Sequence, residues 1–339
     1  MKRHQVIALL GLLCVAFPGA IQSQKQFVET SEAGSTKAVL WKDPGGSPRD
    51  LFYGSGGKEH APPTEGFTFL EEDSEGSNPK FLIQDATGMK WKIKLGPEAE
   101  PEVAASRFLW AAGYFTDEDY FLPKLRVAGV PDDLRRGRDL IDSDGTMRKV
   151  RLERQNKDLK KVGSWKWKDS PFTGTREGNG LRALMALINN WDVKDSNTAI
   201  FRQKNAEGQT EDLYVVTDLG GSFGTNGIVR GEEISRGNLA SYMASRFIRK
   251  TTSEYVDFAT PARAPWMVIG MPSRYWERFH LTWIGKDVPR EDARWLGQIL
   301  AQLTPSQVRD AFRAAGYSDA DVEGFADTIE RRIRELAAL

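Results

Sequence analysis

Apolar and polar residues alternate strictly over residues 89–95, and this is the clearest periodic pattern in the chain. One face carries Met89, Trp91, Ile93 and Leu95, and the other carries Lys90, Lys92 and Lys94. Because successive side chains of a strand point to opposite faces, the alternation predicts a strand with one buried and one charged face. Apolar segments at 67–70 and 80–84 precede it across polar turns, so the three segments predict an antiparallel meander.

A helix and further strands are predicted to complete this first lobe. Pro101 suits the first position of a helix that Gly113 ends. Strand patterns follow at 120–127 and 146–153, the second of them after an Asp-Gly turn. This order predicts an antiparallel-sheet lobe with one helix over residues 67–155.

The pattern of apolar residues over the rest of the chain, residues 156–339, predicts a second lobe that is mostly helical. A helical apolar stripe covers residues 175–190, and from about Glu232 the pattern is again helical, with a helix beginning at Thr304-Pro305. Between them, a hairpin is predicted from strands at 198–202 and 212–217. The expected fold class is therefore α+β with two lobes.

The N-terminal residues have the layout of a secretory signal peptide. Lys2 and Arg3 are followed by an apolar run from Val6 to Val15 and then by the helix-breaking Pro18. Because the run is short for a bilayer span, we expect residues 1–23 to be cleaved between Ala20 and Ser23, with a short uncleaved anchor as the alternative. Residues 24–66 are rich in Gly, Pro, Ser and charge, which predicts a flexible lead-in.

Composition narrows the possible function classes. Without Lys2 and Arg3 the chain has 45 basic and 47 acidic residues, a balance that indicates neither nucleic acid nor an anionic membrane as partner. Cys14 is the only cysteine, so the mature chain would have no thiol for catalysis or metal binding. That absence of disulfides fits a bacterial envelope or periplasmic protein, or one secreted by a bacterium. Three histidines argue against a histidine zinc site.

The candidate chemistry lies in one stretch of the second lobe. Asp192 precedes Asn197 by five positions with Lys194 between them, and Asp218 follows the predicted hairpin within Asp-Leu-Gly. Phosphoryl transfer requires a carboxylate that orients the attacking hydroxyl, and a second carboxylate with an amide oxygen that hold Mg²⁺ on the nucleotide phosphates. The alternative is that these residues only form turns at the ends of helices and strands. The lysine-rich strand and the acidic residues of the helix that follows it favour phosphoryl transfer over this alternative.

These motifs resemble the protein-kinase-like superfamily over about residues 67 to 225. The resemblance is to its atypical members, such as HipA-like and phosphoinositide-type kinases, the secreted Golgi casein kinases, and exported bacterial proteins with an Asn-Asn-Trp-Asp loop. The resemblance implies Mg²⁺ or Mn²⁺ together with ATP or another nucleoside triphosphate as cofactors.

The resemblance also implies a role for each candidate residue. Asp192 would be the catalytic base or hydroxyl-orienting group, with Lys194 in its loop, and Asn197 and Asp218 would be metal ligands. Lys94, or otherwise Lys92, would contact the nucleotide phosphates, with Glu102 of the following helix as partner of the lysine. Glu98 and Glu100 precede Pro101 and are the other acidic residues near the start of this helix.

The chain also departs from the family pattern. Asn190-Trp191 stands where His-Arg usually precedes the loop aspartate, the turn over residues 71–77 is acidic with a single glycine, and no Ala-Pro-Glu segment follows Asp218. The leading hypothesis is an exported Mg²⁺-dependent phosphotransferase that acts on a protein, lipid, sugar or small-molecule hydroxyl. One alternative is a catalytically inactive kinase-fold module that binds a ligand or protein in the envelope. Another is a metal-dependent hydrolase that uses the same carboxylates, but the chain has too few histidines to supply the usual ligands.

Overall fold

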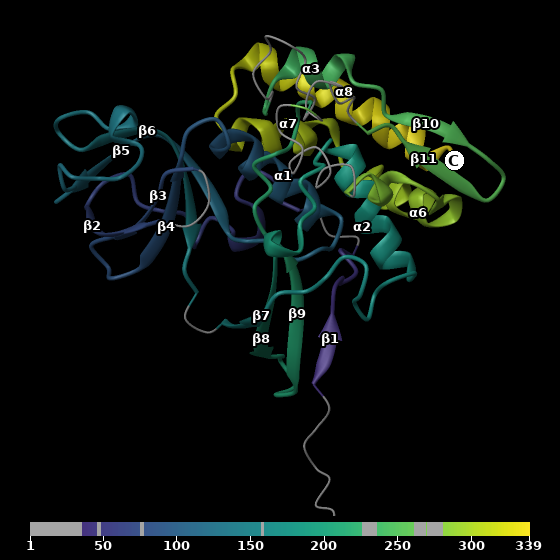
Figure 1. The fold of residues 1–339 in the computed structure, drawn as a ribbon, viewed down its shortest axis with the longest axis horizontal. Coiled ribbons are helices and arrows are strands. Elements are labelled where there is room, and N and C mark those ends of the chain that lie inside the picture. The colour runs from purple at the N-terminus through teal and green to yellow at the C-terminus, as the bar shows by residue number, and fades with distance from the viewer. Residues whose placement is uncertain are drawn as a thin grey trace, which may run out of the picture. The chain divides into compact units, whose positions relative to one another are not determined.

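A closed five-stranded barrel forms the first lobe (Figure 1). The computed structural model describes residues 36–45, 49–74, 78–156, 159–225, 236–260, 269 and 281–339. Around the barrel the strands follow the order β2-β3-β4-β6-β5. They are β2 (Phe67–Asp73), β3 (Lys80–Gln84), β4 (Lys90–Leu95), β5 (Asp119–Ala128) and β6 (Thr146–Arg154). The predicted strands of this lobe, and the antiparallel pairing of the first three, are confirmed.

The alternation in β4 decides which side of the barrel wall each residue faces. Trp91, Ile93 and Leu95 are buried in the barrel core. Lys94 faces the other way, and the antiparallel register places it opposite Lys80 of β3 and Arg151 of β6. Because directly opposite residues of paired strands point to the same face, these three cations form a row on the outer face of the barrel wall.

One helix, α1 (Ala99–Ala111), packs between the barrel and the second lobe. It begins two residues before Pro101, so the prediction that Pro101 opens the helix is slightly wrong. Glu98 is the N-cap residue, and Glu100 and Glu102 lie in the first turn, where negative charge interacts favourably with the helix dipole. The early start places Glu98 and Glu102 one helical turn apart on the same face.

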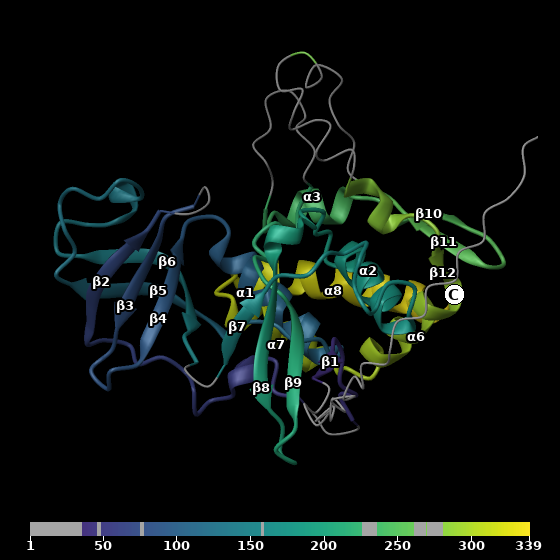
Figure 2. The same cartoon turned by 60° about the horizontal axis from the view of Figure 1, so that its bottom comes forward.

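A second sheet of four strands follows the order β1-β9-β8-β7 and projects between the barrel and the helices (Figures 1 and 2). Its strands are β1 (Lys37–Val39), β7 (Lys160–Gly163), β8 (Thr198–Lys204) and β9 (Thr210–Val216). The predicted hairpin is β8–β9. The flexible lead-in predicted for residues 24–66 is wrong for its described part, because β1 pairs with β9 and both Leu40 and Leu51 are buried in the larger core.

The remaining elements are mostly helices, with one small antiparallel sheet. The helices are α2 (Arg176–Leu187), α3 (Leu239–Ala244), α6 (Arg290–Leu300), α7 (Pro305–Ala314) and α8 (Asp319–Ala337). The sheet consists of β10 (Ile248–Thr251), β11 (Tyr255–Phe258) and β12 (Val288–Pro289). The expectation of helix throughout from Glu232 is therefore wrong at these strands, whose pairing brings together segments about thirty residues apart. The α+β fold class, with a sheet-rich first part and a mostly helical second part, is confirmed.

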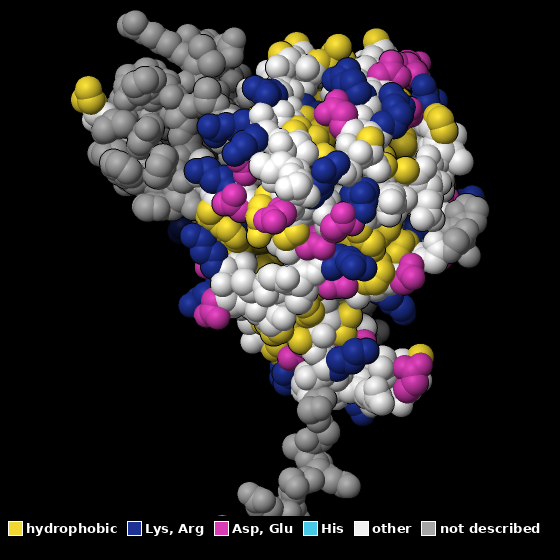
Figure 3. All heavy atoms as spheres, turned by 90° about the vertical axis from the view of Figure 1, so that its right-hand side faces the viewer, with side chains coloured by type: hydrophobic (Ala, Val, Ile, Leu, Met, Phe, Trp, Pro, Cys, Tyr) yellow, Lys and Arg dark blue, Asp and Glu magenta, His cyan; other side chains and the backbone are white. Residues whose placement is uncertain are grey.

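Charges are mixed on the surface of the helical part. On the face shown in Figure 3, Lys and Arg side chains are interspersed with Asp and Glu, which agrees with the formal net charge of zero. Among the described residues, no helix combines the length and the apolar character that crossing a bilayer would require. The signal peptide predicted for residues 1–23 lies outside the described residues.

Candidate functional site

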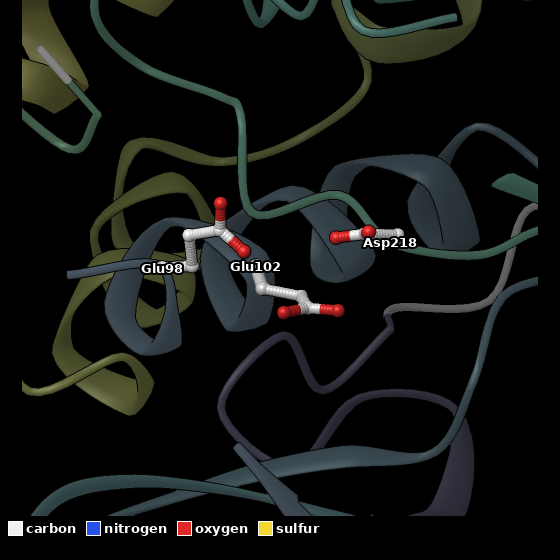
Figure 4. A group of neighbouring side chains, drawn as sticks. All are labelled: Glu98, Glu102 and Asp218. Carbon is white, nitrogen blue, oxygen red and sulfur yellow. The ribbon is translucent and has the colours of Figure 1, made fainter. Parts of the chain in front are cut away.

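Lys94 lies at the centre of a buried cluster of charges. Its side chain is 1% exposed. Its Nζ lies 2.7 Å from Glu102 Oε2, 2.8 Å from Asp218 Oδ1 and 3.3 Å from Glu98 Oε2. Figure 4 shows the three carboxylates, with Glu98 at the N-cap of α1, Glu102 in its first turn and Asp218 in the segment after β9. Strand, helix and loop thus each supply part of one site.

The electrostatics of this cluster favour ionised groups. Burial by itself lowers the pKa of Lys94, but the carboxylates of Glu102 and Asp218 outweigh it, so this pKa is raised. Burial by itself raises the pKa of Asp218, but Lys94 outweighs it, and that pKa is lowered. Each group therefore holds its neighbour in the charged state.

The backbone after β9 is shaped to bring Asp218 to the lysine. Asp218 has φ of 53°, in the left-handed region that few non-glycine residues adopt. Two residues later, a Cβ at Gly220 would lie 2.6 Å from Cβ of Glu98, which is too close for any side chain. The glycine of Asp-Leu-Gly is thus required because this segment packs directly against the start of α1.

Arg151 extends the cluster away from Lys94. It donates to Glu102 at 3.2 Å and to Glu153 at 2.7 Å, and its Nη1 lies 3.5 Å from Asp119 Oδ1. Burial raises the pKa of Asp119 to about 7, and Arg151 opposes this shift. Sequence reasoning did not identify Arg151 or Asp119, because neither lies in a motif. Their place in the site follows from strand register.

A cavity of about 450 Å³ adjoins the cluster. Its charged side includes Lys80, Lys92, Lys94, Glu102, Arg151, Glu153 and Asp218. Its apolar lining includes Phe115, Leu159, Ala199, Phe201, Leu213 and Val215. The apolar residues come largely from the β8–β9 hairpin, which also delivers Asp218. A cavity lined by both charged and apolar side chains suits a ligand that has an anionic part and a flat apolar part.

The loop after α2 holds Asp192 by hydrogen bonds. The backbone N–H of Asp192 donates to Asn190 Oδ1 at 3.0 Å, and Asn197 Nδ2 donates to the backbone oxygen of Asp192 at 2.9 Å. Lys194 Nζ lies 3.2 Å from Asp192 Oδ1. The backbone N–H of Thr217 donates to the backbone oxygen of Asn197 at 3.0 Å. This bond connects the loop to the residue before Asp218.

The structure brings together some of the candidate residues and separates others. Lys94, Glu102 and Asp218 are in direct contact. Asp192, Lys194 and Asn197 form a neighbouring group, joined to Asp218 through Thr217. Lys92 lines the cavity, but its Nζ pairs with Asp73 at 2.9 Å rather than with the cluster. Glu98 was missed as a contact of Lys94, although its (i, i+4) spacing to Glu102 at the start of the predicted helix could have indicated that both glutamates lie on one face.

The chain matches no family model, and no curated protein matches its sequence. It is similar in structure to the proinflammatory kinase CtkA of Helicobacter pylori, with 11% identity and a TM-score of 0.39 over 81% of this chain and 99% of that chain. It is also similar to the Golgi casein kinase with Mn and ADP bound, with 9% identity and a TM-score of 0.40 over 82% of this chain and 72% of that chain. A second structure of the Golgi casein kinase has 9% identity and a TM-score of 0.39. These structural neighbours are kinases, and all three TM-scores are below 0.5.

Proposed function

We propose that this protein is a phosphotransferase that moves a phosphoryl group from a nucleoside triphosphate to a hydroxyl acceptor and depends on Mg²⁺ or Mn²⁺. The observation that supports this most is the contact of Lys94 with both Glu102 and Asp218 at the charged side of the cavity. A strand lysine held by a helix glutamate, beside an aspartate that binds the metal, is how protein kinases hold nucleotide phosphates.

The donor atoms present fit a hard divalent cation. Ligand oxygens of Glu98, Glu102 and Asp218 lie within 4.8 Å of one another, and Mg²⁺ and Mn²⁺ prefer such carboxylate oxygens. Asn197 donates through Nδ2 to the backbone oxygen of Asp192, and its Oδ1 accepts from Ser196 Oγ at 3.3 Å, which leaves that oxygen one further lone pair for a metal ion. Asp218 and Asn197 would hold the ion, which when bound would neutralise negative charge on the phosphates.

The other residues have separate proposed roles. Lys94 binds phosphate oxygens as a point charge, and Glu102 holds the lysine in place. The apolar residues of β8 and β9 contact the nucleotide base. Asp192 orients the acceptor hydroxyl and accepts its proton, and Lys194, whose Nζ lies 3.2 Å from Asp192 Oδ1, pairs with this carboxylate. The two lobes would divide near residue 155, with the nucleotide between them.

Export remains part of the proposal. Residues 1–23 would direct the chain out of the bacterial cytoplasm and be removed, so the enzyme would act in the periplasm or envelope, or after secretion. The acceptor would then be a hydroxyl of a protein, lipid, sugar or small molecule in that compartment.

One observation favours a second candidate, a kinase-fold module that binds without catalysis. Each carboxylate of the cluster already has a cationic partner, because Lys94 contacts all three while Arg151 contacts Glu102 and Arg236 pairs with Glu98. A metal ion would have to displace one of these cationic side chains from the carboxylate that it binds. Catalysis by the wild-type protein distinguishes the two candidates.

The test separates the two aspartates. Asp218→Asn should abolish the Mg²⁺-dependent stabilisation of the protein by ATP, and it should also abolish the production of ADP. The reason is that a carboxylate that binds the metal contributes to nucleotide binding already in the ground state. Asp192→Asn should keep ATP affinity within a few-fold but slow transfer by roughly 10²-fold or more, because a general base acts mainly in the transition state.

The measurements are a thermal-shift titration and an ADP-release assay, each with ATP or GTP and with Mg²⁺ or Mn²⁺. Asp212→Asn is the matched control, since Asp212 lies on the same hairpin, pairs with Arg202 at 2.7 Å and does not line the cavity. If wild type binds no nucleotide under any condition, the phosphotransferase proposal fails. If it binds but never releases ADP, the binding-module candidate replaces it.

A further inference from the structure

The cation row on the barrel wall contains one member, Lys80, that differs from the other two in its carboxylate contacts. Lys80, Lys94 and Arg151 stand side by side on β3, β4 and β6, and all three line the cavity. Lys94 and Arg151 are each surrounded by carboxylates at 2.7 to 3.5 Å. In the part of the chain that the structure describes, Lys80 forms no ion pair.

The surroundings of Lys80 make this charge unfavourable in the unliganded protein. Its side chain is half-buried at the cavity wall. Burial lowers the pKa of Lys80, the neighbouring Lys94 lowers it further, and Asp218 only partly opposes both. Asp218 and Glu102 are already bound to Lys94. A partly desolvated ammonium beside a second ammonium indicates a place where an anion binds.

We propose that Lys80 binds a second phosphate group of the nucleotide, next to the phosphate that Lys94 binds. This inference rests on the proposed function and names its ligand class, a nucleoside di- or triphosphate rather than a monophosphate. Directly paired residues on antiparallel strands have Cα atoms about 4.5–5.5 Å apart, so two adjacent lysine side chains can contact successive phosphates of one chain. The apolar wall formed by β8 and β9 receives the base.

The family resemblance gave Lys92 only as the alternative to Lys94 for contacting the phosphates, and the strand register places Lys80, not Lys92, beside Lys94. Lys92 lies opposite Leu82, not opposite Lys80, and its charge is neutralised by Asp73 at 2.9 Å. Lys80 is the first residue of its strand and follows a proline, so no alternation marks it in the sequence. Its position across from Lys94 is a consequence of the strand pairing.

The test compares Lys80→Met with two control variants in the full chain. Lys90→Met is the matched control, because Lys90 is on β4, is exposed and does not line the cavity. Lys92→Met tests the neighbouring paired lysine. Binding of ADP, AMP and inorganic tripolyphosphate, each with Mg²⁺, is measured by calorimetry, and the melting temperature is measured without ligand.

We expect Lys80→Met to weaken ADP and tripolyphosphate binding roughly tenfold to a hundredfold, the effect of losing one hydrogen bond to a charged group. AMP binding should change less than twofold, and Lys90→Met should match wild type for all three ligands. The unliganded Lys80→Met protein should melt at or above the wild-type temperature, because repulsion between Lys80 and Lys94 is removed.

The outcomes distinguish this inference from the proposed function. If Lys80→Met binds ADP as tightly as wild type, the role of Lys80 is refuted while nucleotide binding by the protein stands. Equal losses for AMP and ADP would also refute it, since Lys80 would then act on the first phosphate or the base. If wild type binds neither ADP nor ATP, the proposed function itself fails and the inference fails with it. A clearly lower melting temperature for Lys80→Met would assign the lysine a structural role instead.

Discussion

Replacing Lys94 by methionine tests whether the charge cluster is held together by this one ammonium. Methionine is close to lysine in length and keeps the packing of a side chain that is 1% exposed. The substitution removes the cation that contacts Glu98, Glu102 and Asp218 at once. Three carboxylates would then face one another without it, and we expect the variant to fold with a lower free energy of unfolding.

The expected loss is about 3–5 kcal/mol, the usual cost of breaking a buried ion pair by removing one partner. The geometry leads to a similar figure. Ligand oxygens of the three carboxylates lie within 4.8 Å of one another. At an effective dielectric constant near 20, two unit charges at about that distance repel by about 3.5 kcal/mol. Arg151 beside Glu102 and Arg236 beside Glu98 offset part of the repulsion among the three groups.

The loss of unfolding free energy in Lys94→Met should become smaller as the pH is lowered from 7 to 5. The pKa of Lys94 is higher in the folded protein than in the unfolded chain. The stability that Lys94 contributes is therefore fully present at pH values below its unfolded-state pKa, and is lost only as pH rises through its folded-state pKa. The pKa of Asp218 is lowered, so its contribution in wild type is present at neutral pH and is lost as pH falls. In the variant the carboxylates repel one another and take up protons more readily. The difference between wild type and variant should therefore shrink from pH 7 to pH 5.

Denaturant unfolding followed by the fluorescence of the ten tryptophans measures this at both pH values. Lys90→Met, an exposed position on the same strand, should differ from wild type by about 0.5 kcal/mol or less. A loss for Lys94→Met below about 1 kcal/mol at pH 7 would contradict the reasoning, because a buried ion pair of this kind is worth more. A difference that grows at pH 5 would contradict the electrostatic explanation.

Two further predictions concern the buried acid beside Arg151 and the N-terminus. The pKa of Asp119 is raised by burial from 3.8 to about 7, so the folded state retains a proton that the unfolded state loses, and stability should fall as pH rises between these values. Asp119→Asn should flatten this fall in unfolding free energies measured from pH 4.5 to 7.5, and an unchanged slope would show that another group is responsible. Expressed with its own leader in a bacterium, the chain should begin near Ile21 to Gln24 when the exported protein is sequenced from its N-terminus. Met1 retained on a protein in the membrane fraction would overturn this.

Local patterns in the sequence were enough to predict the main elements around the site and the order of the motifs. The alternation over residues 89–95 identified β4 and assigned Trp91 and Ile93 to one face and Lys94 to the other, because a strand repeats every two residues. The apolar stripe before Asn190 and the two strands before Asp218 placed both aspartates at the ends of regular elements. These features depend on neighbouring residues, so a local pattern is enough to predict them.

Most of the charge contacts in the cluster depend on the three-dimensional arrangement of the elements. Strand register placed Lys80 and Arg151 on either side of Lys94, and the start of α1 at Ala99 brought Glu98 to the lysine together with Glu102. Pairing of β1 with β9 ordered a segment whose composition predicts flexibility. These contacts join residues that are up to 174 positions apart, as for Lys37 and Glu211. Their stability depends on burial and charge compensation that no local pattern records, and for that reason the partners of Lys94 could be only partly predicted.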